Sequence, residues 1–424
     1  MKQIDNTDAD LPVGERFTSP QKNTGYFFSV VPIDTALEQI RKIAPDIGNE
    51  TISLDEADER ILAMPVYASS DIPGFDRSWK DGYALIAADT VSASEAVPVL
   101  LTCTGTIEMG EDDKTTISRG LCRYIPTGGT LPPGADAVVM IEYTERLDNA
   151  ILIKRPVFSG ENCIKKDEDF SAGDLIFEAG WVLRPQDIGV LASIGKAFIR
   201  VRKKPIIGII STGRELVPVD ACPQPGQVRE VNSHLISVIL RRHGAIPVHY
   251  GIVRDDEEHL TDLLNTAADE CDAVIISGGS SKDEKDITAR VIEACGTVYI
   301  HGISLAPGKP TIIGTVAKKP VIGLPGHPAS TCMVLILVVT PLIQAMEGKS
   351  VSHTISLPVR MTTSVPSEKG RETYIRVRIQ DGNATPLLGK SGLLNTLKDS
   401  DGIIRVPAGV EGLEAGDMTE AILW

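Results

Sequence analysis

Three short apolar runs in the second half of the chain each stop at a turn rich in glycine, proline and hydroxyl side chains. PIIGII leads into STGREL, AVIIS into GGSSKDEKD, and PVIGL into PGHPAST. Glycine allows a ligand close to the backbone, and free N–H groups at the start of a following helix attract anions. A phosphate-bearing substrate is therefore expected to contact the residues of these turns: Ser211, Thr212, Gly213, Ser277, Gly278, Gly279, Ser280, Pro325, Gly326, His327 and Pro328.

Carboxylates lie in or after the same strand ends. Glu215 is part of STGREL, Asp255 follows the run IPVHYGIV, and Asp286 closes the charged stretch KDEKD. A carboxylate beside a phosphate is favourable only if a cation lies between them, and Mg2+ is the simplest such cation. These three acids are therefore the predicted metal ligands.

A simpler interpretation competes with this one. A single SGG or STG turn is more often ordinary turn chemistry, and Asp286 alone is also a good N-cap for a solvated helix start. His327, between a glycine and a proline, is better explained as a turn residue or hydrogen-bond donor than as a catalytic base. Three such turns at one edge of a sheet favour a binding site over plain turns.

The turns can meet only if the preceding elements form one sheet. Strand-like runs alternate with helical segments between residues 203 and 346. This alternation predicts a doubly wound α/β domain, with a parallel sheet covered on both faces. Ligands bind beyond the carboxyl ends of such strands, so this fold would place all three turns at one edge.

The rest of the chain has a different pattern of apolar and turn residues. From Pro65 to about Val182, and again after Gly348, short β-prone runs are separated by turn residues, which predicts a β-rich domain and a small C-terminal barrel or sandwich. Residues 33–48 have helical spacing, with Asp34 as a plausible N-cap. The apolar stretch Met333–Ile343 is too short to span a membrane and is predicted to be a core helix.

The composition restricts which partners the protein can bind and in which compartment of the cell it is expected. The chain of 424 residues carries a formal net charge of -15, which repels nucleic acid and anionic membranes. The polar, acidic start lacks the apolar region of a signal peptide and is expected to be a mobile extension. The seven scattered cysteines include no CxxC pair, which argues against a disulfide framework or zinc cluster and favours the cytoplasm.

A second group of motifs lies outside the α/β segment. It comprises DIPGFDRSWKDGYAL, IPTGGTLPPGADAVVMIE and GENCIKKDEDFSAGD, each of which alone is explained as a charged or Pro/Gly-rich connection. Together with RPQDIGVLASIG, STGRELVP, GIVRDD, SGGSSKDEKD, APGKP, GLPGHPAS and GKSGLLNTL, in this order, they resemble the MoeA/gephyrin E-domain family, the molybdopterin molybdenumtransferases. The resemblance covers nearly the whole chain from about residue 30.

The resemblance implies an elongated protomer of four domains behind the N-terminal extension. The expected segments are an extension (1–28), a linker domain (29–50, 66–78 and 168–202), a β-rich domain (51–65 and 79–167), a MogA-like α/β molybdopterin-binding domain (203–346) and a C-terminal β-barrel (347–424). It also implies a homodimer with clefts shared between subunits, and a MogA-like adenylyltransferase and apo-molybdoenzymes as further partners.

The implied activity belongs to molybdenum cofactor biosynthesis. Such an enzyme inserts molybdate, or tungstate, into adenylyl-molybdopterin, with Mg2+-dependent hydrolysis of the adenylate and release of AMP. By the resemblance, Pro325 and Pro328 match the prolines of GLPGNP. The catalytic residues that it implies are Asp81 in KDGYA, Thr127 in PTGG, Asp169 in KKDED, Glu215 in STGREL, Asp255 in RDD and Asp286.

The chain differs from the family pattern in the number and position of its lysines. The family commonly reads K-x-x-x-K-P-G-K-P, and here Gly302 and Ala306 replace the first two lysines while Lys309 remains. Lys282 is new to the SGG loop, and we hypothesise that it takes over part of the oxyanion or phosphate binding. The alternative is a solvated lysine paired with Asp283 or Glu284.

Two other functions compete with the insertase. One is a non-catalytic molybdopterin-binding or scaffold protein of the same fold, which the loss of two lysines would suit. The other is an adenylyltransferase like MogA, which fits residues 203–346 but leaves the β-rich half unexplained. Retention of Asp81, Glu215, Asp255 and Asp286 favours the insertase.

Overall fold

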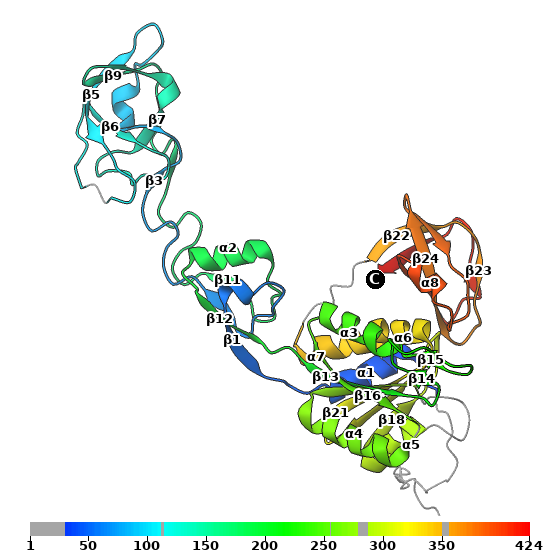
Figure 1. Ribbon diagram of the computed structural model, residues 1–424. Coiled ribbons are helices and arrows are strands. Elements are labelled where there is room, and N and C mark those ends of the chain that lie inside the picture. The colour runs from blue at the N-terminus through cyan, green and yellow to red at the C-terminus, as the bar shows by residue number, and fades with distance from the viewer. Residues whose placement is uncertain (1–29, 112–113, 255, 279–286, 350–355) are drawn as a thin grey trace, which may run out of the picture.

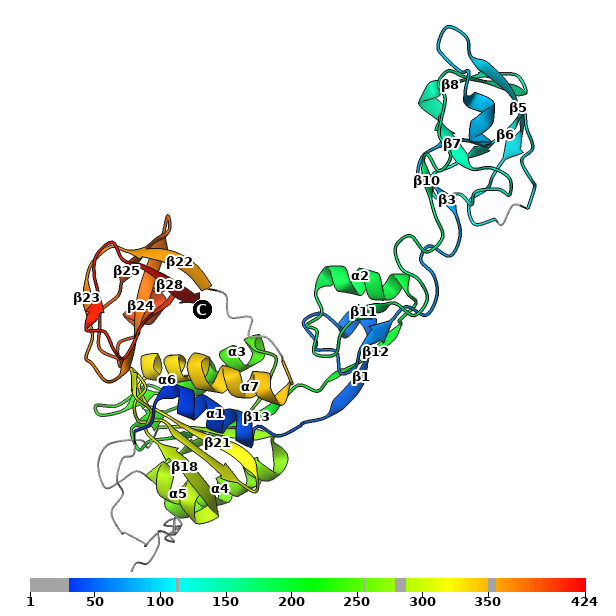
Figure 2. The ribbon, with the colours of Figure 1, turned by 180° about the vertical axis from the view of Figure 1, so that it is seen from behind.

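The protein is elongated, with a β-rich domain at one end and an α/β body at the other (Figure 1). The computed structural model describes residues 30–111, 114–254, 256–278, 287–349 and 356–424. A small middle domain connects the two ends, and a C-terminal barrel lies beside the α/β body, as the view from behind also shows (Figure 2). The expected extension at residues 1–28 lies outside the described part of the chain.

The α/β body is built on a sheet with the strand order β16-β13-β17-β21-β20-β18. All four predicted strands are present and run parallel: β16 Ile246–Val253, β13 Ile206–Thr212, β17 Ala273–Ser277 and β21 Lys319–Leu324. β20 (Ile312–Val316) and β18 (Gly296–His301) then add antiparallel strands, so the expectation of a purely parallel sheet is wrong at this edge. The cause is a two-residue hairpin turn at Ala317 and Lys318, which both have positive φ.

Helices cover both faces of this sheet, as predicted. One face carries α1 Ile33–Ile43, α3 Asn232–Arg242, α6 Pro328–Val334 and α7 Thr340–Met346. The other face carries α4 Glu257–Glu270 and α5 Ile287–Cys295. In α4 the buried residues Leu260, Leu264 and Ala267 recur every three or four positions, so the helix presents one apolar stripe to the sheet.

The apolar helix near the end of the α/β body lies in its core. A π-helical segment, Leu335–Val339, joins α6 to α7 in one helical run. Among the described residues, Pro328–Met346 is the one stretch long and apolar enough to cross a membrane, yet 78% of its window is buried inside the protein. Met333, Val338 and Leu342 belong to the main hydrophobic cluster, which confirms the predicted core helix.

Helix α1 packs in a different place from the one expected. Its Ile33, Ala36 and Ile40 are buried against the α/β sheet, so it belongs to the α/β body and not to the linker domain. The reason is its apolar stripe, which needs a hydrophobic partner surface. Its N-cap is Pro32, without a side-chain cap bond, so the prediction of Asp34 as N-cap is also wrong.

The middle domain contains residues that were expected in the β-rich domain. β1 (Asn49–Ser53) pairs with β12 (Phe198–Arg202), and Leu62 joins the core that lies beneath α2 (Pro185–Ser193). Residues 51–65 therefore pack with the middle domain, because their strand partner and their apolar neighbours both lie there. A second pair, β2 (Val66–Tyr67) and β11 (Leu175–Phe177), completes it.

The β-rich domain is a sheet with the strand order β7-β4-β6-β5-β9-β8. The chain enters and leaves the domain side by side, where β3 (Arg77–Ser78) pairs with β10 (Cys163–Ile164). Its strands are β4 Gly82–Leu85, β5 Val99–Thr106, β6 Leu121–Ile125, β7 Ala137–Met140, β8 Thr144–Leu147 and β9 Ala150–Ile153.

The C-terminal domain is a closed barrel. Its sheet has the order β24-β25-β22-β28-β26, and an additional pairing of β24 with β26 closes it. β19 (Leu305–Ala306) of the α/β body joins β24 in parallel, which docks the barrel on that body. The barrel strands are β22 Ser356–Met361, β24 Glu372–Gln380, β25 Asn383–Pro386, β26 Gly402–Val406 and β28 Met418–Leu423.

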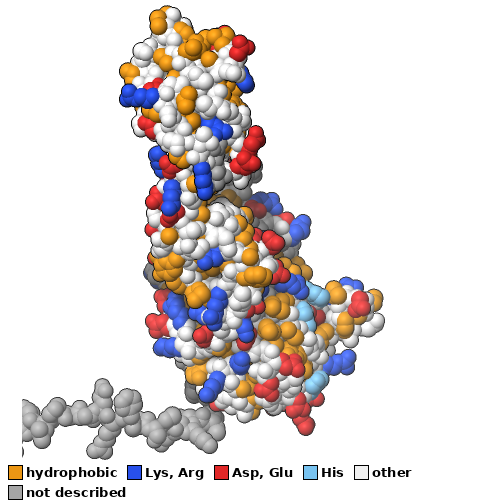
Figure 3. All heavy atoms as spheres, turned by 90° about the vertical axis from the view of Figure 1, so that its left-hand side faces the viewer, with side chains coloured by type: hydrophobic (Ala, Val, Ile, Leu, Met, Phe, Trp, Pro, Cys, Tyr) orange, Lys and Arg blue, Asp and Glu red, His pale blue; other side chains and the backbone are white. Residues whose placement is uncertain are grey.

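The cysteines and the surface charges agree with the composition. All seven cysteines are free, and burial raises the pKa of Cys122 and of Cys332 to about 12, so these two thiols serve packing. On the face drawn in Figure 3, acidic and basic side chains are interspersed with hydrophobic ones.

Candidate functional site

The carboxyl ends of β13, β17 and β21 meet at one edge of the sheet. Ser211 is in register with Ser277, and Ser277 is in register with Leu324. The turns that begin at Ser211, Ser277 and Pro325 are therefore neighbours, as the fold prediction required.

Asn232, the first residue of α3, ties two of these turns together. Its Nδ2 donates to Ser277 Oγ at 2.8 Å and to the Gly326 carbonyl at 2.9 Å. Its Oδ1 is buried and has no hydrogen-bond partner among the described residues. The only signal of this role in the sequence is the position of Asn232 at a helix start, which by itself does not predict a link between two turns.

Gly213 and Gly278, in two of these turns, use their N–H groups within the protein. Gly278 has φ +105, and a Cβ on it would lie 2.1 Å from the Thr212 carbonyl oxygen. Its N–H donates to the Leu324 carbonyl at 3.3 Å, and the N–H of Gly213 donates to the Val253 carbonyl at 3.1 Å. The expected anion binding by these two amides is therefore wrong, because both turns bond back to neighbouring strands.

One of the three predicted metal ligands can be placed. Glu215 lies at the strand-end site, and both of its carboxylate oxygens come within 3.0 Å of where a Cβ on Gly213 would be. Asp255 and Asp286 lie outside the described residues, as do Gly279, Ser280 and Lys282. Within the described ranges no group of three or more acidic, histidine or cysteine side chains could hold a metal ion. Of the three acids that the sequence predicts as metal ligands, only Glu215 lies in the described part of the chain.

The loop that carries Lys309 is fixed where the barrel docks. The Lys309 carbonyl accepts from the N–H groups of Ile303 and Thr311, both at 2.9 Å, and Thr311 Oγ1 donates to the Gly308 carbonyl at 2.6 Å. Just before this loop, Leu305 and Ala306 pair with β24. The backbone at Lys309 is therefore held at the junction of the α/β body and the barrel.

The barrel also reaches the turn after β21. Ser391 Oγ lies 3.0 Å from His327 Nδ1, and the Ala329 N–H donates to the Ser391 carbonyl at 3.2 Å. His327 therefore serves as a hydrogen-bonding turn residue, which is the role that the sequence favoured. Through these contacts the C-terminal domain lies against the turn that follows β21.

A buried arginine of the barrel lies next to this contact. Arg376 on β24 is 6% exposed, and its Nη2 donates to the Gly389 carbonyl at 3.2 Å. Its Nε and Nη1 have no hydrogen-bond partner among the described residues, and burial lowers its pKa. A buried cation with unused donors is costly unless an anion joins it, so Arg376 is a candidate oxyanion ligand. The sequence analysis missed it because ETYIRVRIQ only predicts a strand.

The β-rich domain holds a second predicted pair, Asp81 and Thr127. Asp81 Oδ1 accepts from the Thr127 N–H at 2.7 Å and from Thr127 Oγ1 at 3.0 Å. Both hydrogen bonds lower the pKa of Asp81, and the one from the Thr127 backbone contributes more than the one from its side chain. The carboxylate is therefore kept ionised in an exposed position.

Asp169 lies in a bend where the chain returns from the same domain, just before Phe170, which bridges to Ile72. Its N–H donates to the Ile72 carbonyl at 2.9 Å. The lysines before it are paired: Lys165 with Asp76 and Lys166 with Asp71, both at 2.9 Å. The two lysines are thus largely neutralised by carboxylates of the DIPGFDRSWKDGYAL segment.

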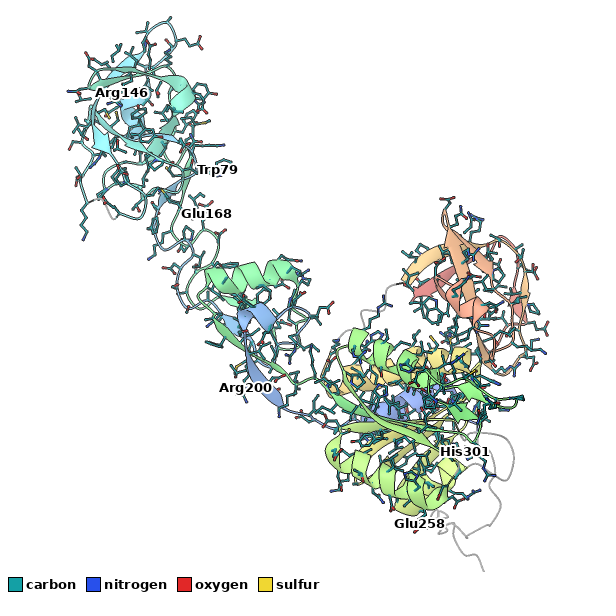
Figure 4. All side chains as sticks on the ribbon, viewed as in Figure 1. Trp79, Arg146, Glu168, Arg200, Glu258 and His301 are labelled. Carbon is teal, nitrogen blue, oxygen red and sulfur yellow. The ribbon has the colours of Figure 1, made fainter. Side chains whose placement is uncertain are left out.

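The two groups of predicted residues are far apart within one chain. Figure 4 shows Trp79 and Glu168, close in sequence to Asp81 and Asp169, near the base of the β-rich domain. His301 and Glu258 lie on the α/β body at the other end of the molecule. The acids of the β-rich half therefore do not reach the strand-end site of their own chain.

Three family models match the chain in order. They are the MoeA N-terminal region (domain I and II) at residues 31–195, a "Probable molybdopterin binding domain" at residues 208–345, and the MoeA C-terminal region (domain IV) at residues 358–424.

A protein of Methanocaldococcus jannaschii is 34% identical over 88% of this chain and 91% of its own length. The molybdopterin molybdenumtransferase of Nostoc sp. is 32% identical, over 79% of this chain and 78% of its own. The crystal structure of the molybdopterin biosynthesis MoeA protein from Pyrococcus horikosii superimposes with a TM-score of 0.82 at 37% identity, covering 93% of this chain and 99% of that one.

Proposed function

The chain belongs to the MoeA family, and we propose that it is a molybdopterin molybdenumtransferase that acts in molybdenum cofactor biosynthesis in the cytoplasm. It would take adenylyl-molybdopterin and molybdate, or tungstate, as substrates, and release AMP as the metal is inserted. The observation that carries this proposal is the strand-end site, where Ser211, Ser277 and Glu215 lie at one sheet edge.

The protein's part in this reaction is positioning and charge neutralisation. The hydroxyls of Ser211 and Ser277 lie at the edge where the phosphate would be held, and Glu215 would hold the Mg2+ that lowers its negative charge. Arg376 and the anchored Lys309 supply positive charge on the barrel side. They suit molybdate, a dianion that must enter a protein of net charge -15.

Replacing Arg376 with methionine should raise the half-saturating molybdate concentration about 10- to 100-fold, since charge-assisted hydrogen bonds contribute about 1.5–3 kcal/mol. The melting temperature should change little, because methionine has a similar volume and the variant loses one hydrogen bond, from Nη2 to the Gly389 carbonyl, while Nε and Nη1 have no partner among the described residues. The measurement is AMP release against molybdate concentration. Arg378→Met on the same strand, whose exposed arginine pairs with Asp399, is the control and should change nothing. An unchanged molybdate dependence for Arg376→Met would remove Arg376 from the site.

The distance between the two groups of residues supports a homodimer. Asp81, Thr127 and Asp169 can complete the strand-end site only if a second copy of the chain brings them there. We therefore propose clefts shared between two subunits. A MogA-like adenylyltransferase would supply the adenylylated substrate, and apo-molybdoenzymes would receive the product.

The test of the proposed function is AMP release by the purified protein. Adenylyl-molybdopterin and Mg2+ are supplied with molybdate, with tungstate or with neither, and the expected result is release that depends on the oxyanion. Tight binding of adenylyl-molybdopterin without any AMP release under all three conditions would favour the non-catalytic, scaffold-like function.

A further inference from the structure

Lys80, the residue directly before Asp81, is a half-buried cation without a carboxylate partner. Its Nζ lies over the Trp79 ring, 4.8 Å from the ring centroid, and forms no hydrogen bond or ion pair with any residue in the described part of the chain. Partial burial removes water from the ammonium group, and the aromatic face replaces only part of that solvation. The three N–H donors of the group are therefore available to a ligand.

The other lysines at the base of the β-rich domain are already neutralised. Lys165 and Lys166 each form an ion pair at 2.9 Å with a carboxylate of the DIPGFDRSWKDGYAL segment. Lys80 also has a carboxylate next to it in the sequence, but that carboxylate, Asp81, accepts its two hydrogen bonds from Thr127. Of these three lysines, Lys80 is thus the one whose charge no described residue compensates.

The backbone that carries Lys80 is fixed by the loops around it. Ser78 is 1% exposed, its N–H donates to the Gly129 carbonyl at 2.9 Å, and its Oγ donates to the Lys80 carbonyl at 2.5 Å. The Trp79 N–H donates to the Asn162 carbonyl at 2.9 Å. Both residues are therefore held in place before a ligand arrives, which lowers the entropic cost of binding.

Trp79 supports the lysine from the surface of the domain. Its side chain is 59% exposed, and Figure 4 shows it near the base of the β-rich domain. A cation–π interaction attracts the ammonium group to the ring without cancelling its positive charge, as a carboxylate would. The ring thus fixes where the charge lies and leaves it able to attract an anion.

We propose that Lys80 binds a tetrahedral oxyanion in the shared cleft, either a phosphate of adenylyl-molybdopterin or molybdate, and that Trp79 is its positioning residue; this inference rests on the proposed function. In the proposed dimer, Lys80 of one chain accompanies Asp81 to the strand-end site of the other. There it would offset the negative charge of the acids in a site for anions. It would also replace part of the positive charge that the chain lacks at Gly302 and Ala306.

The experiment measures the binding of adenylyl-molybdopterin and of molybdate to the full-length protein by calorimetry. Lys80→Met keeps the apolar stem and removes the charge, so it should weaken the binding of at least one ligand about 10- to 100-fold, and the ligand affected identifies the oxyanion. Lys80→Arg keeps the charge and should stay within about fivefold of the wild type. Lys154→Met is the control: Lys154 belongs to the same domain and already pairs with Glu145 at 2.9 Å, so this variant should bind both ligands normally.

Tryptophan fluorescence provides a readout of position that is independent of affinity. An anion bound at Lys80 lies next to the Trp79 ring and should change its emission. Trp79→Phe should abolish this change and keep the affinity within about fivefold, because phenylalanine retains an aromatic face for the ammonium group. Trp181→Phe, a change in the middle domain, should preserve the fluorescence response.

The outcomes separate the role of Lys80 from the enzymatic function. Unchanged binding of both ligands to Lys80→Met would overturn the inference, as would an equal loss in Lys80→Arg, because the charge would then not be what binds. A fluorescence response that survives in Trp79→Phe would place the anion elsewhere. Weaker binding in Lys80→Met but not in Lys80→Arg would support the inference, even if the wild-type protein released no AMP and the proposed catalysis failed. A wild-type protein that bound neither ligand would overturn both proposals.

Discussion

Glu215→Ala is expected to lower the rate of oxyanion-dependent AMP release about 100- to 1000-fold, which is the usual loss when a group that stabilises transition-state charge is removed. The side chain is exposed at the end of β13, where it serves a ligand and not the core. The melting temperature should therefore stay within a few degrees of the wild type, as for an ordinary surface substitution. The measurements are AMP release at saturating substrate and a thermal melt on the same sample.

A matched control distinguishes the loss of the carboxylate at position 215 from the loss of a negative charge elsewhere on the surface. Glu293→Ala removes another exposed acid, from α5, and should keep full activity. If Glu215→Ala instead lowers the melting temperature as much as a core truncation, with catalysis per folded molecule intact, Glu215 is a structural residue and its assignment as a metal ligand is wrong.

Mixing Asp81→Ala subunits with Glu215→Ala subunits should restore about one quarter of the wild-type activity. Random exchange makes about half of the dimers hybrid, and one of the two clefts in each hybrid has both acids intact, which gives a half of a half. Each variant alone should be nearly inactive. The measurement is AMP release before and after subunit exchange, with differently tagged subunits to count the hybrids.

The control for this mixture uses two defects on the same side of the cleft. In hybrids of Asp81→Ala with Thr127→Ala, both clefts carry a damaged β-rich half, because these residues are hydrogen-bonded to each other in one domain. No recovery is expected there. If the Asp81→Ala and Glu215→Ala subunits exchange but AMP release does not recover, the proposal of a cleft shared between subunits is wrong.

Local patterns were enough to predict much of the α/β body. The four parallel strands, the helices between them and the core helix at 333–343 follow from apolar runs and their spacing, since burial of a continuous apolar surface depends mainly on those. The antiparallel edge was missed because its turn at Ala317 and Lys318 has positive φ without the Gly or Asn that normally announces it.

The residues of the candidate site also divide into those that local patterns predict and those that they do not. Asp81 and Thr127 could be selected by their motifs and prove to be hydrogen-bonded partners. Arg376 and Asn232 could not be selected, because their distinguishing property is a buried polar atom that finds no partner in the described part of the chain. That property depends on what other segments leave unsatisfied after packing, and no local pattern reports it.

The sequence by itself determined the family resemblance, the alternation that builds the α/β sheet and the residue types at its strand ends. Only the tertiary structure decided that α1 packs on this sheet, that residues 51–65 join the middle domain, and that the barrel contributes Arg376 and Ser391 beside His327. The physical reason is that strand ends are set by short-range periodicity and backbone hydrogen bonding. Which distant surface covers an apolar stripe, or satisfies a buried charge, is set by the packing of the whole chain.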